Sequence, residues 1–390
     1  MTEQQEKQVD FIVFSDDWGE HPSSCQHLFR HLAENHRVLW VNTIGMRNPR
    51  FCRRDLKKIA LKVKKMFRGR GKGEKKRPDD LAITVCQPPM LPYSNFCLIR
   101  AINRVLVRRV VRQQLRKLGF QAPILVTTVP NSCDSIGHLG ERLVVYYCVD
   151  DFSQWPGLEK ELVRKMEKRL INRADRFIAS SQKLYERLKR TGRPAYLLTH
   201  GVDLELYRQE PAAEHPLLAD IPGPRIGYFG LFDDRSDQSF LLEAAIRLPH
   251  VSFVITGQVE ADISALSRQV NIHFTGPVAY EALPAMVKGW DGCMLFYRVN
   301  DLTDAIQPLK LKEYLATGKP IFVTPIAEAL PLNEYLTVVH DVEEFVDRYR
   351  FLSGATEPMV TPQLNDFLQR ESWQRKSRVF LAKCCENLNL

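Results

Sequence analysis

The 390-residue sequence predicts an α/β protein with two doubly wound domains, each built on a parallel sheet. Short apolar runs, typical of buried strands, alternate with segments of helical apolar spacing in both halves of the chain. A proline-rich stretch, about 205–224, interrupts this alternation once, and the alternation then restarts. The chain is also longer than one hydrophobic core usually serves, so two or more domains are expected.

The first half opens with a strand, a helix and a second strand. The apolar run 11–14 ends in the polar loop 15–19, as expected for a buried strand with a loop at its carboxyl end. Ser23 and Ser24 can cap the helix that follows, and the run 38–41 completes a βαβ unit. A parallel sheet is therefore expected from the start of the chain.

Further alternation fills the rest of this half. The predicted strands are 81–85, 124–128, 143–149, 176–181 and 196–199, and the predicted helices are about 95–118 and 159–174. The strand 143–149 ends in Asp150 and Asp151. Asp150 can receive the proton of an attacking hydroxyl, but adjacent aspartates at a strand end also cap helices, and both interpretations remain open. For His200, at a turn, we expect a structural role.

The second half contains the stretch that defines the candidate site. Its predicted strands are 225–230, 251–257, 272–276, 292–296 and 321–323. Between the last two, a proline at the start and Gly318-Lys319-Pro320 at the end predict a helix over about 308–317. Two such domains joined by a linker place a ligand cleft between the carboxyl edges of their sheets.

Lys310 and Glu313 share one face of this helix, near its N-terminus. A lysine in the first turn opposes the helix dipole unless an anion binds there. Free backbone N–H groups, including that of Leu309, would form a phosphate pocket with Lys310, and Glu313 could accept hydrogen bonds from hydroxyls of the same ligand. The alternative is a solvated Lys–Glu pair on a surface helix.

The positive charge of the chain is concentrated in one segment. Residues 53–77 hold 13 Lys and Arg against Asp55 and Glu74, a local charge of +11, so the rest carries +9 − 11 = −2. The segment has the apolar spacing of a basic amphipathic helix, which binds anionic membranes or nucleic acid, or is a solvated excursion. Membrane is the favoured interpretation, because no nucleic-acid motif accompanies the charge.

Composition also restricts the cellular setting. Nine cysteines at scattered spacings indicate a reduced cytoplasmic protein without disulfides or a zinc site. No apolar run approaches a spanning helix, and residues 1–10 do not form a signal peptide. We therefore expect a cytoplasmic protein, with peripheral association at the inner face of the membrane as a further candidate property.

Several motifs occur together in a consistent order. They are Asp16-Asp17-Trp18 with His21-Pro22-Ser23-Ser24, the run 146–151, His200-Gly201-Val202-Asp203, the run 226–230, the run 274–277 and the stretch 308–320. In this order the chain resembles a glycosyltransferase of the GT-B fold, most closely the retaining family 4 group of bacterial sugar transferases.

The resemblance implies a nucleotide-sugar donor, UDP- or GDP-linked, on the second domain and an acceptor on the first. No other cofactor and no metal are implied. The corresponding domains are 1–207 for the acceptor, 208–224 as linker, 225–368 for the donor and 369–390 as a helix crossing back to the first domain.

The resemblance also assigns residue roles. Glu313 matches the second of two paired glutamates and binds ribose, and Lys310 faces the diphosphate, where its charge stabilises the leaving nucleotide. The first glutamate of the pair is replaced by Ala305. Asp301, Thr303 or Asp304 could contact the donor sugar instead.

Two loops depart from the family pattern. After Gly230, where relatives carry two cations for the diphosphate, Arg235 is the local cation, either a phosphate ligand or the partner of a neighbouring aspartate. The first loop has Gly19 as its only glycine, so His21, Ser23 and Ser24 are candidate donor contacts, or His21 has no ligand.

The expected function is metal-independent, retaining transfer of a sugar to a glycan or lipid-linked acceptor during bacterial surface polysaccharide assembly. Two alternatives remain at this stage: a UDP-sugar 2-epimerase of the same architecture, which would act on the donor alone, and a non-catalytic assembly or nucleic-acid-binding protein.

Overall fold

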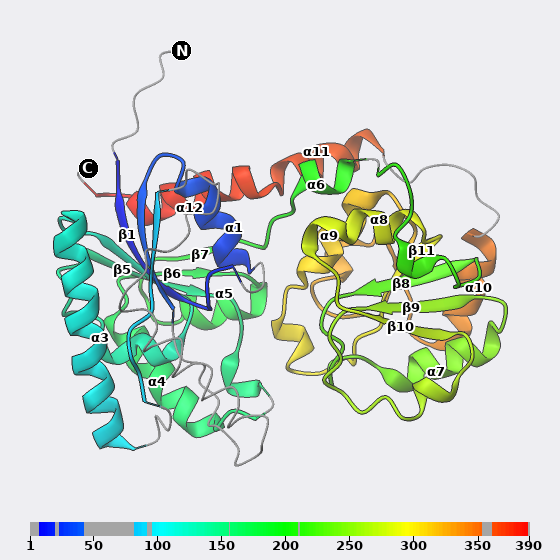
Figure 1. Cartoon of the computed structure of the whole chain (residues 1–390), viewed down its shortest axis with the longest axis horizontal. Helices are drawn as coiled ribbons and strands as arrows, with labels where there is room; N and C mark the ends of the chain where they lie inside the picture. The colour runs from blue at the N-terminus through cyan, green and yellow to red at the C-terminus, as the bar shows by residue number, and fades with distance from the viewer. Residues whose placement is uncertain are drawn as a thin grey trace. The chain divides into compact units, whose positions relative to one another are not determined.

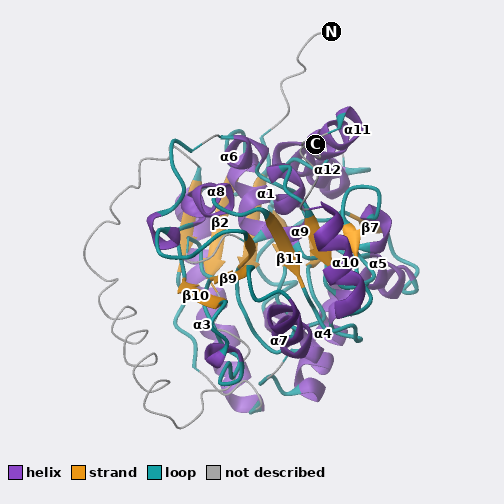
Figure 2. Cartoon of the chain, turned by 90° about the vertical axis from the view of Figure 1, so that its right-hand side faces the viewer, coloured by secondary structure: helices purple, strands orange, loops and turns teal. Residues whose placement is uncertain are grey.

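The computed structural model describes residues 8–19, 23–42, 82–91, 96–155, 157–209, 211–352 and 361–388. The chain forms two compact units, one of Met1–Leu198 with Ser377–Leu390 and one of Thr199–Lys376. The elements of each unit are labelled in Figure 1. Strands form the centre and helices surround them, as the colouring in Figure 2 shows. The predicted α/β class with two parallel-sheet domains is confirmed.

In its described part, the first unit contains a seven-stranded parallel sheet in the order β3-β2-β1-β4-β5-β6-β7. The chain passes from β3 back to β4 beside β1, so the strand order reverses between β1 and β4. The strands are β1 Asp10–Ser15, β2 Arg37–Asn42, β3 Ile83–Cys86, β4 Ile124–Thr127, β5 Leu143–Cys148, β6 Arg176–Ala179 and β7 Ala195–Leu197. The helices are α1 Ser24–Leu32, α3 Cys97–Leu118, η1 Pro130–Asp134, η2 Phe152–Gln154, α4 Lys160–Arg173 and α5 Gln182–Lys189.

The end of the chain returns to the first unit through α12 (Trp373–Cys385). Phe380 meets Phe29 of α1 and Tyr147 of β5 edge to face, with ring centroids 5.8 and 5.4 Å apart. Arg176 of β6 donates hydrogen bonds to the carbonyl groups of Lys383 and Cys384. This aromatic packing explains why α12 (red) lies beside α1 (blue) in Figure 1.

The sheet described in the second unit is parallel, six-stranded and ordered β10-β9-β8-β11-β12-β13, so its order reverses between β8 and β11. The strands are β8 Arg225–Phe229, β9 Ser252–Thr256, β10 Ile272–Gly276, β11 Gly292–Leu295, β12 Ile321–Val323 and β13 Thr337–Val338. The helices are α6 Leu204–Arg208, η3 Pro216–Leu218, α7 Gln238–Arg247, η4 Leu266–Arg268, η5 Tyr280–Ala282, α8 Leu283–Lys288, η6 Thr303–Ala305, α9 Leu309–Thr317, η7 Leu330–Leu332, α10 Val342–Leu352 and α11 Pro362–Arg370.

The predicted domain boundaries need correction. The segment 208–224 is part of the second unit and not a free linker, because Leu218 and Ile221 are buried in its core. Residues 199–207, predicted for the first domain, also belong to the second unit, where Tyr207 is buried in the same core. At the other end, the second unit continues to Lys376 rather than ending at residue 368.

No helix in the described part of the chain is long and apolar enough to cross a membrane. The basic segment 53–77 and His21 lie outside the described residues.

Candidate functional site

The candidate site lies where the strand order of the second unit reverses. Gly230 follows β8 directly, and Tyr297 comes two residues after the end of β11. Parallel doubly wound sheets bind ligands at the carboxyl ends of the two strands that flank this reversal. The side chains of α9 that reach these strand ends therefore form the candidate site.

Lys310, in the first turn of α9, extends over the end of β8. Its Nζ donates a hydrogen bond to the Tyr297 hydroxyl at 3.2 Å and lies 4.9 Å from the centre of the Tyr228 ring. A Cβ at Gly230 would lie 2.3 Å from Cε of Lys310, and the φ angle of this glycine is +118°. Glycine at position 230 is thus required for the lysine to occupy its place.

A second cation approaches the same tyrosine. The Arg235 guanidinium lies 5.8 Å from the centre of the Tyr297 ring and forms an ion pair with Asp233. Burial opposes ionisation of Tyr297, but the charges of Lys310 and Arg235 lower its pKa. Two cationic side chains therefore converge on the Tyr297 ring, where they could also attract an anionic ligand. The predicted pairing of Arg235 with a neighbouring aspartate is observed, and its role as a phosphate ligand stays a prediction.

Glu313 occupies the other part of the α9 face and is 7% exposed. Its Oε1 accepts a hydrogen bond of 3.0 Å from the Tyr280 hydroxyl. Burial raises the pKa of Glu313 to about 7, although Tyr280, the charge of Lys310 and Tyr207 act against this shift. A carboxylate held in this way is a fixed acceptor for hydroxyl groups of a ligand.

The N-terminus of α9 has no side-chain cap and no acidic residue in its first turn. Its backbone N–H groups, with that of Leu309 first, therefore add to the positive charge of Lys310. In the preceding η6, the Thr303 hydroxyl donates to the carbonyl of Arg298 at 2.5 Å, so this side chain is used within its own loop. Asp304 stays partly exposed, and Ala305 is buried.

The first-loop candidates have structural contacts in the first unit. Ser23 caps α1, as predicted, by accepting a hydrogen bond from the N–H of Gln26, and it donates to a carboxylate oxygen of Asp16 at 3.0 Å. Gly19 donates its N–H to the Gln26 side chain at 3.0 Å, and Ser24 is buried. Their roles toward a ligand stay predictions.

The paired aspartates after β5 differ from each other. Asp151 is the helix cap, since its Oδ1 accepts hydrogen bonds from the N–H and the hydroxyl of Ser153. Asp150 is 8% exposed, and its Oδ1 accepts the N–H of Asp151 at 2.8 Å. Capping therefore applies to Asp151, and the role of Asp150 as proton acceptor stays a prediction.

His200 has structural contacts, as expected. Its N–H donates to the Gln307 side chain at 2.7 Å, and its ring centroid lies 6.4 Å from that of Trp373.

The whole chain is similar to solved glycosyltransferase structures. Anabaena Alr3699/HepE in complex with UDP and glucose superposes with a TM-score of 0.66 at 13% identity, covering 98% of this chain and 100% of that one. Sucrose-phosphate synthase from Thermosynechococcus elongatus gives a TM-score of 0.68 at 13% identity, covering 96% and 97% of the two chains. The chain has the GT-B fold.

A family model matches the part of the chain that contains the candidate site. Residues 223–353 match the family described as Glycosyl transferases group 1, and this segment includes Gly230, Arg235, Lys310 and Glu313. The chain is also 29% identical over 198 residues to the putative teichuronic acid biosynthesis glycosyltransferase TuaH of Bacillus subtilis (strain 168). That alignment covers 47% of this chain and 50% of TuaH, so it spans about half of each protein.

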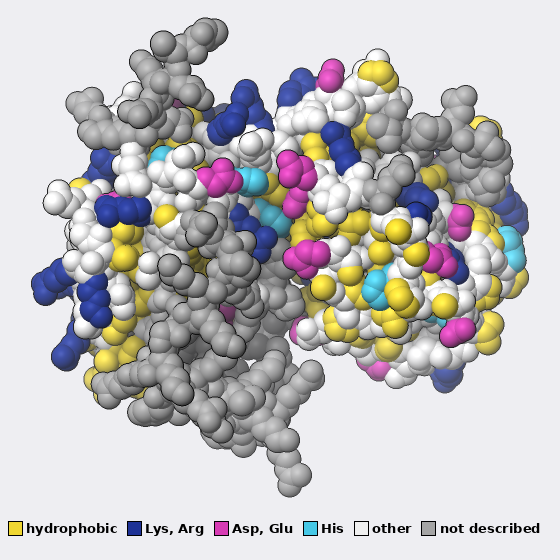
Figure 3. All heavy atoms as spheres, turned by 45° about the horizontal axis from the view of Figure 1, so that its top comes forward, with side chains coloured by type: hydrophobic (Ala, Val, Ile, Leu, Met, Phe, Trp, Pro, Cys, Tyr) yellow, Lys and Arg dark blue, Asp and Glu magenta, His cyan; other side chains and the backbone are white. Residues whose placement is uncertain are grey.

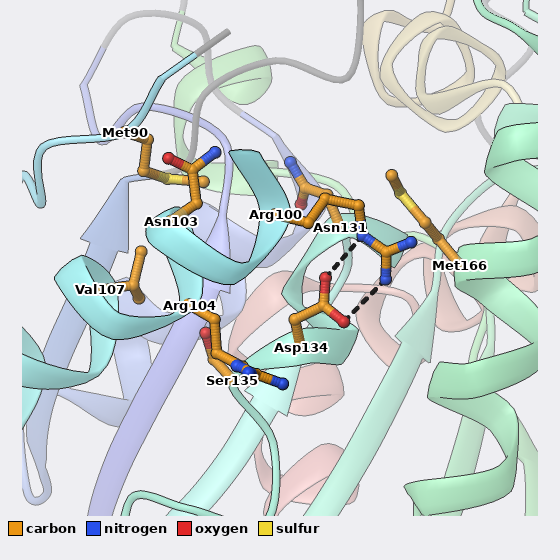
Figure 4. Close-up of a pocket in the computed structure, with 9 residues that line it drawn as sticks. All are labelled: Met90, Arg100, Asn103, Arg104, Val107, Asn131, Asp134, Ser135 and Met166. Atoms are coloured by element: carbon orange, nitrogen blue, oxygen red, sulfur yellow. Dashed lines mark hydrogen bonds and ion pairs between the residues drawn. The ribbon is translucent and has the colours of Figure 1, made fainter. Parts of the chain in front are cut away.

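This GT-B chain also has a small pocket in its first unit, between α3, η1 and α4 (Figure 4). Its volume is about 30 Å³, enough for about one water molecule. Arg100 and Asp134 line it and form an ion pair of 2.7 Å. A sugar nucleotide does not fit in a pocket of this size.

Sequence reasoning missed three tyrosines of the second unit that contact Lys310 and Glu313. Tyr297 and Tyr228 contact Lys310, and Tyr280 bonds Glu313. Tyr228 and Tyr297 lie in or just beyond predicted strands, so the available signal was an aromatic residue near a carboxyl strand end. Tyr280 had no such signal, because it follows a loop.

Proposed function

We propose that the chain is a glycosyltransferase that moves a hexose from a UDP- or GDP-sugar to a glycan or lipid-linked acceptor in bacterial surface polysaccharide synthesis. The observation that carries the proposal is the α9 face, where Lys310 and Glu313 lie at the strand-order reversal of the second unit. The UDP and glucose bound by the Anabaena relative and the role named for TuaH support it.

In this proposal the donor diphosphate binds Lys310, Arg235 and the first backbone N–H groups of α9. Their positive charge stabilises the nucleotide diphosphate as the glycosidic bond breaks, so transfer is expected without a divalent metal. Glu313 accepts hydrogen bonds from the ribose hydroxyls, and Asp304 is the candidate for the donor sugar. Asp150 of the first unit is the candidate acceptor of the attacking hydroxyl's proton. Retention of the anomeric configuration is part of the same proposal.

We also propose that the protein works in the cytoplasm at the inner face of the membrane. The basic segment 53–77 supports this part, since a charge of +11 is attracted to anionic lipid.

A thermal-shift panel of UDP-, GDP- and dTDP-sugars tests the donor site. We expect one nucleotide class to raise the melting temperature, and Lys310→Ala and Glu313→Ala to abolish that rise. Lys319→Ala and Glu281→Ala are matched controls, because they remove the same charges elsewhere in the second unit. A shift that survives in both site variants would contradict the assignment. Added EDTA is expected to leave transfer unchanged.

A further inference from the structure

The outward face of α3 in the first unit combines apolar and cationic side chains. Leu98, Ile102 and Val105 follow one another at helical spacing and are 69%, 39% and 61% exposed. The same stripe continues into exposed arginines. These are Arg109, Arg112 and Arg116. The opposite face of the helix packs into the core of the unit through Val107, Val111 and Leu115.

The helix is strongly positive along its whole length. It contains six arginines and one lysine and no acidic residue. Arg100 is paired with Asp134. Within the described ranges, no acidic side chain forms an ion pair with Arg104, Arg109, Arg116 or Lys117. Among the described residues of the first unit, the positive charge of this surface is therefore largely uncompensated.

The apolar half of the stripe is also unusual for this protein. Of the thirteen large apolar side chains that are exposed in the described part of the chain, five fall between Leu91 and Val105. Figure 3 shows yellow apolar and dark-blue basic side chains together at the edge of the molecule where α3 lies in Figure 1. Exposed apolar patches bordered by polar groups commonly mark interaction sites.

The apolar end of α3 lies near the ligand-binding edge of the sheet. Arg100, in its first turns, pairs with Asp134 of η1, which follows β4 shortly after the carboxyl end of that strand (Figure 4). Ligands bind at this edge in doubly wound sheets. A surface bound through α3 would thus lie close to the predicted acceptor side of the first unit.

We propose that the α3 surface, made of Phe96, the apolar stripe and the three exposed arginines, docks on an anionic lipid bilayer. The apolar side chains enter the interfacial region, and the guanidinium groups bind lipid phosphates. A nucleic acid would use the arginines but would leave the apolar half without a partner, so the bilayer is favoured. This inference rests on the proposed function in one respect, which is that the acceptor is linked to a lipid.

Vesicle co-sedimentation of the full chain tests the docking surface without donor or acceptor. Phosphatidylcholine vesicles are compared with vesicles that also contain phosphatidylglycerol. The test variant combines Arg109→Glu, Arg112→Glu and Arg116→Glu, and the control combines Arg268→Glu, Arg348→Glu and Arg350→Glu, which change the net charge equally in the second unit. Because each basic residue at an anionic surface strengthens binding roughly fivefold, we expect the test variant to bind about 100-fold more weakly or worse.

A second pair of variants separates the contributions. Leu98→Ser with Val105→Ser should weaken binding to anionic vesicles even at high salt, where arginine contacts are screened. Vesicle binding should remain, and should still depend on the α3 arginines, when five lysines of the basic segment are neutralised. These are Lys57, Lys58, Lys62, Lys64 and Lys65.

Binding by the arginine variant within twofold of the unchanged protein would overturn the proposal. An equal loss of vesicle binding in the second-unit control variant would also overturn it. The same holds if an RNA oligonucleotide binds as strongly as the vesicles and its binding is unchanged by Leu98→Ser with Val105→Ser. The nucleotide-sugar thermal shift serves as the separate readout. If the unchanged protein shows the thermal shift with a nucleotide sugar but does not bind vesicles, only the docking surface is rejected. If the unchanged protein shows no thermal shift with any nucleotide sugar, the proposed function is rejected.

Discussion

Acidification from about pH 8 to about pH 6 is expected to weaken binding of the nucleotide sugar about tenfold. Burial raises the pKa of Glu313 to about 7, against the effects of Tyr280 and Lys310. The ionised carboxylate accepts hydrogen bonds from two hydroxyls, whereas the protonated form uses one oxygen as a donor. If only the ionised form binds, the Kd scales as 1 plus ten to the power (pKa − pH), roughly 11 at pH 6 and roughly 1.1 at pH 8.

The same shift affects unfolding with a defined sign. A carboxyl group whose pKa is raised on folding stabilises the fold below its unfolded value of 4.5 and loses that contribution as the pH rises through about 7. Donor binding and stability therefore change in opposite directions over this interval, which separates a binding effect from partial unfolding at low pH.

Isothermal titration calorimetry with the best nucleotide sugar from the thermal-shift panel measures the effect. A nucleotide sugar is suitable because its diphosphate ester keeps the same charge over this range, so the ligand adds no titration. Glu313→Gln keeps an acceptor for the Tyr280 hydroxyl but cannot ionise, and its Kd should not change with pH. Tyr280→Phe removes a contact that lowers the pKa of Glu313, so its transition should move to higher pH. Wild-type affinity that is constant within twofold, or a tenfold change that persists in Glu313→Gln, would refute this reasoning.

Three further substitutions test the site and its support. Gly230→Ala should weaken donor binding by about 100-fold and lower the free energy of unfolding by about 1–3 kcal/mol, because the added Cβ would collide with Lys310 at a φ angle that favours glycine. Titration with donor measures the affinity and urea unfolding measures the stability. An unchanged affinity would contradict the contact. Tyr297→Phe removes the hydroxyl bonded to Lys310 and should raise the KM for the donor about fivefold with little change in melting temperature. Lys312→Ala should lower the free energy of unfolding by about 3 kcal/mol, since it leaves Glu371 without one of its buried partners; a loss below about 1 kcal/mol in urea unfolding would argue against this.

The elements that local signals determine could be predicted from the sequence. The helix expected over about 308–317 is observed as α9, Leu309–Thr317, with Pro308 as the residue before it and Gly318 in the left-handed conformation that ends it. The helix expected over about 95–118 is observed as α3, Cys97–Leu118, again with a left-handed glycine after it. Capping by Ser23 also depends on neighbouring residues alone.

Features that depend on distant parts of the chain could not be predicted in this way. Tyr297 and Lys310 meet because β11 ends and α9 begins at the same edge of one sheet, and Tyr280 of η5 reaches Glu313 across 33 positions of the sequence. The segment 208–224 has the composition of a linker, but Leu218 and Ile221 reach a core formed by residues far along the chain. Proline content alone does not distinguish a free linker from an irregular segment that covers a core.

One face of α9 carries the candidate site residues, and another face anchors the helix within the second unit. Lys310 reaches the ends of β8 and β11 and Glu313 contacts Tyr280. Lys312, about 200° around the helix from Lys310, points elsewhere. Its ammonium group donates to the Thr199 hydroxyl at 2.9 Å and also bonds the carboxylate of Glu371. Thr199 is the first residue of the second unit, and Glu371 lies close to its end at residue 376. The helix that carries the candidate donor site is therefore fixed, by one buried ionic cluster, to both points at which the chain passes between the two units. A sequence that keeps Lys310 and Glu313 but loses this cluster would retain the chemistry of the site without the support that holds it in place.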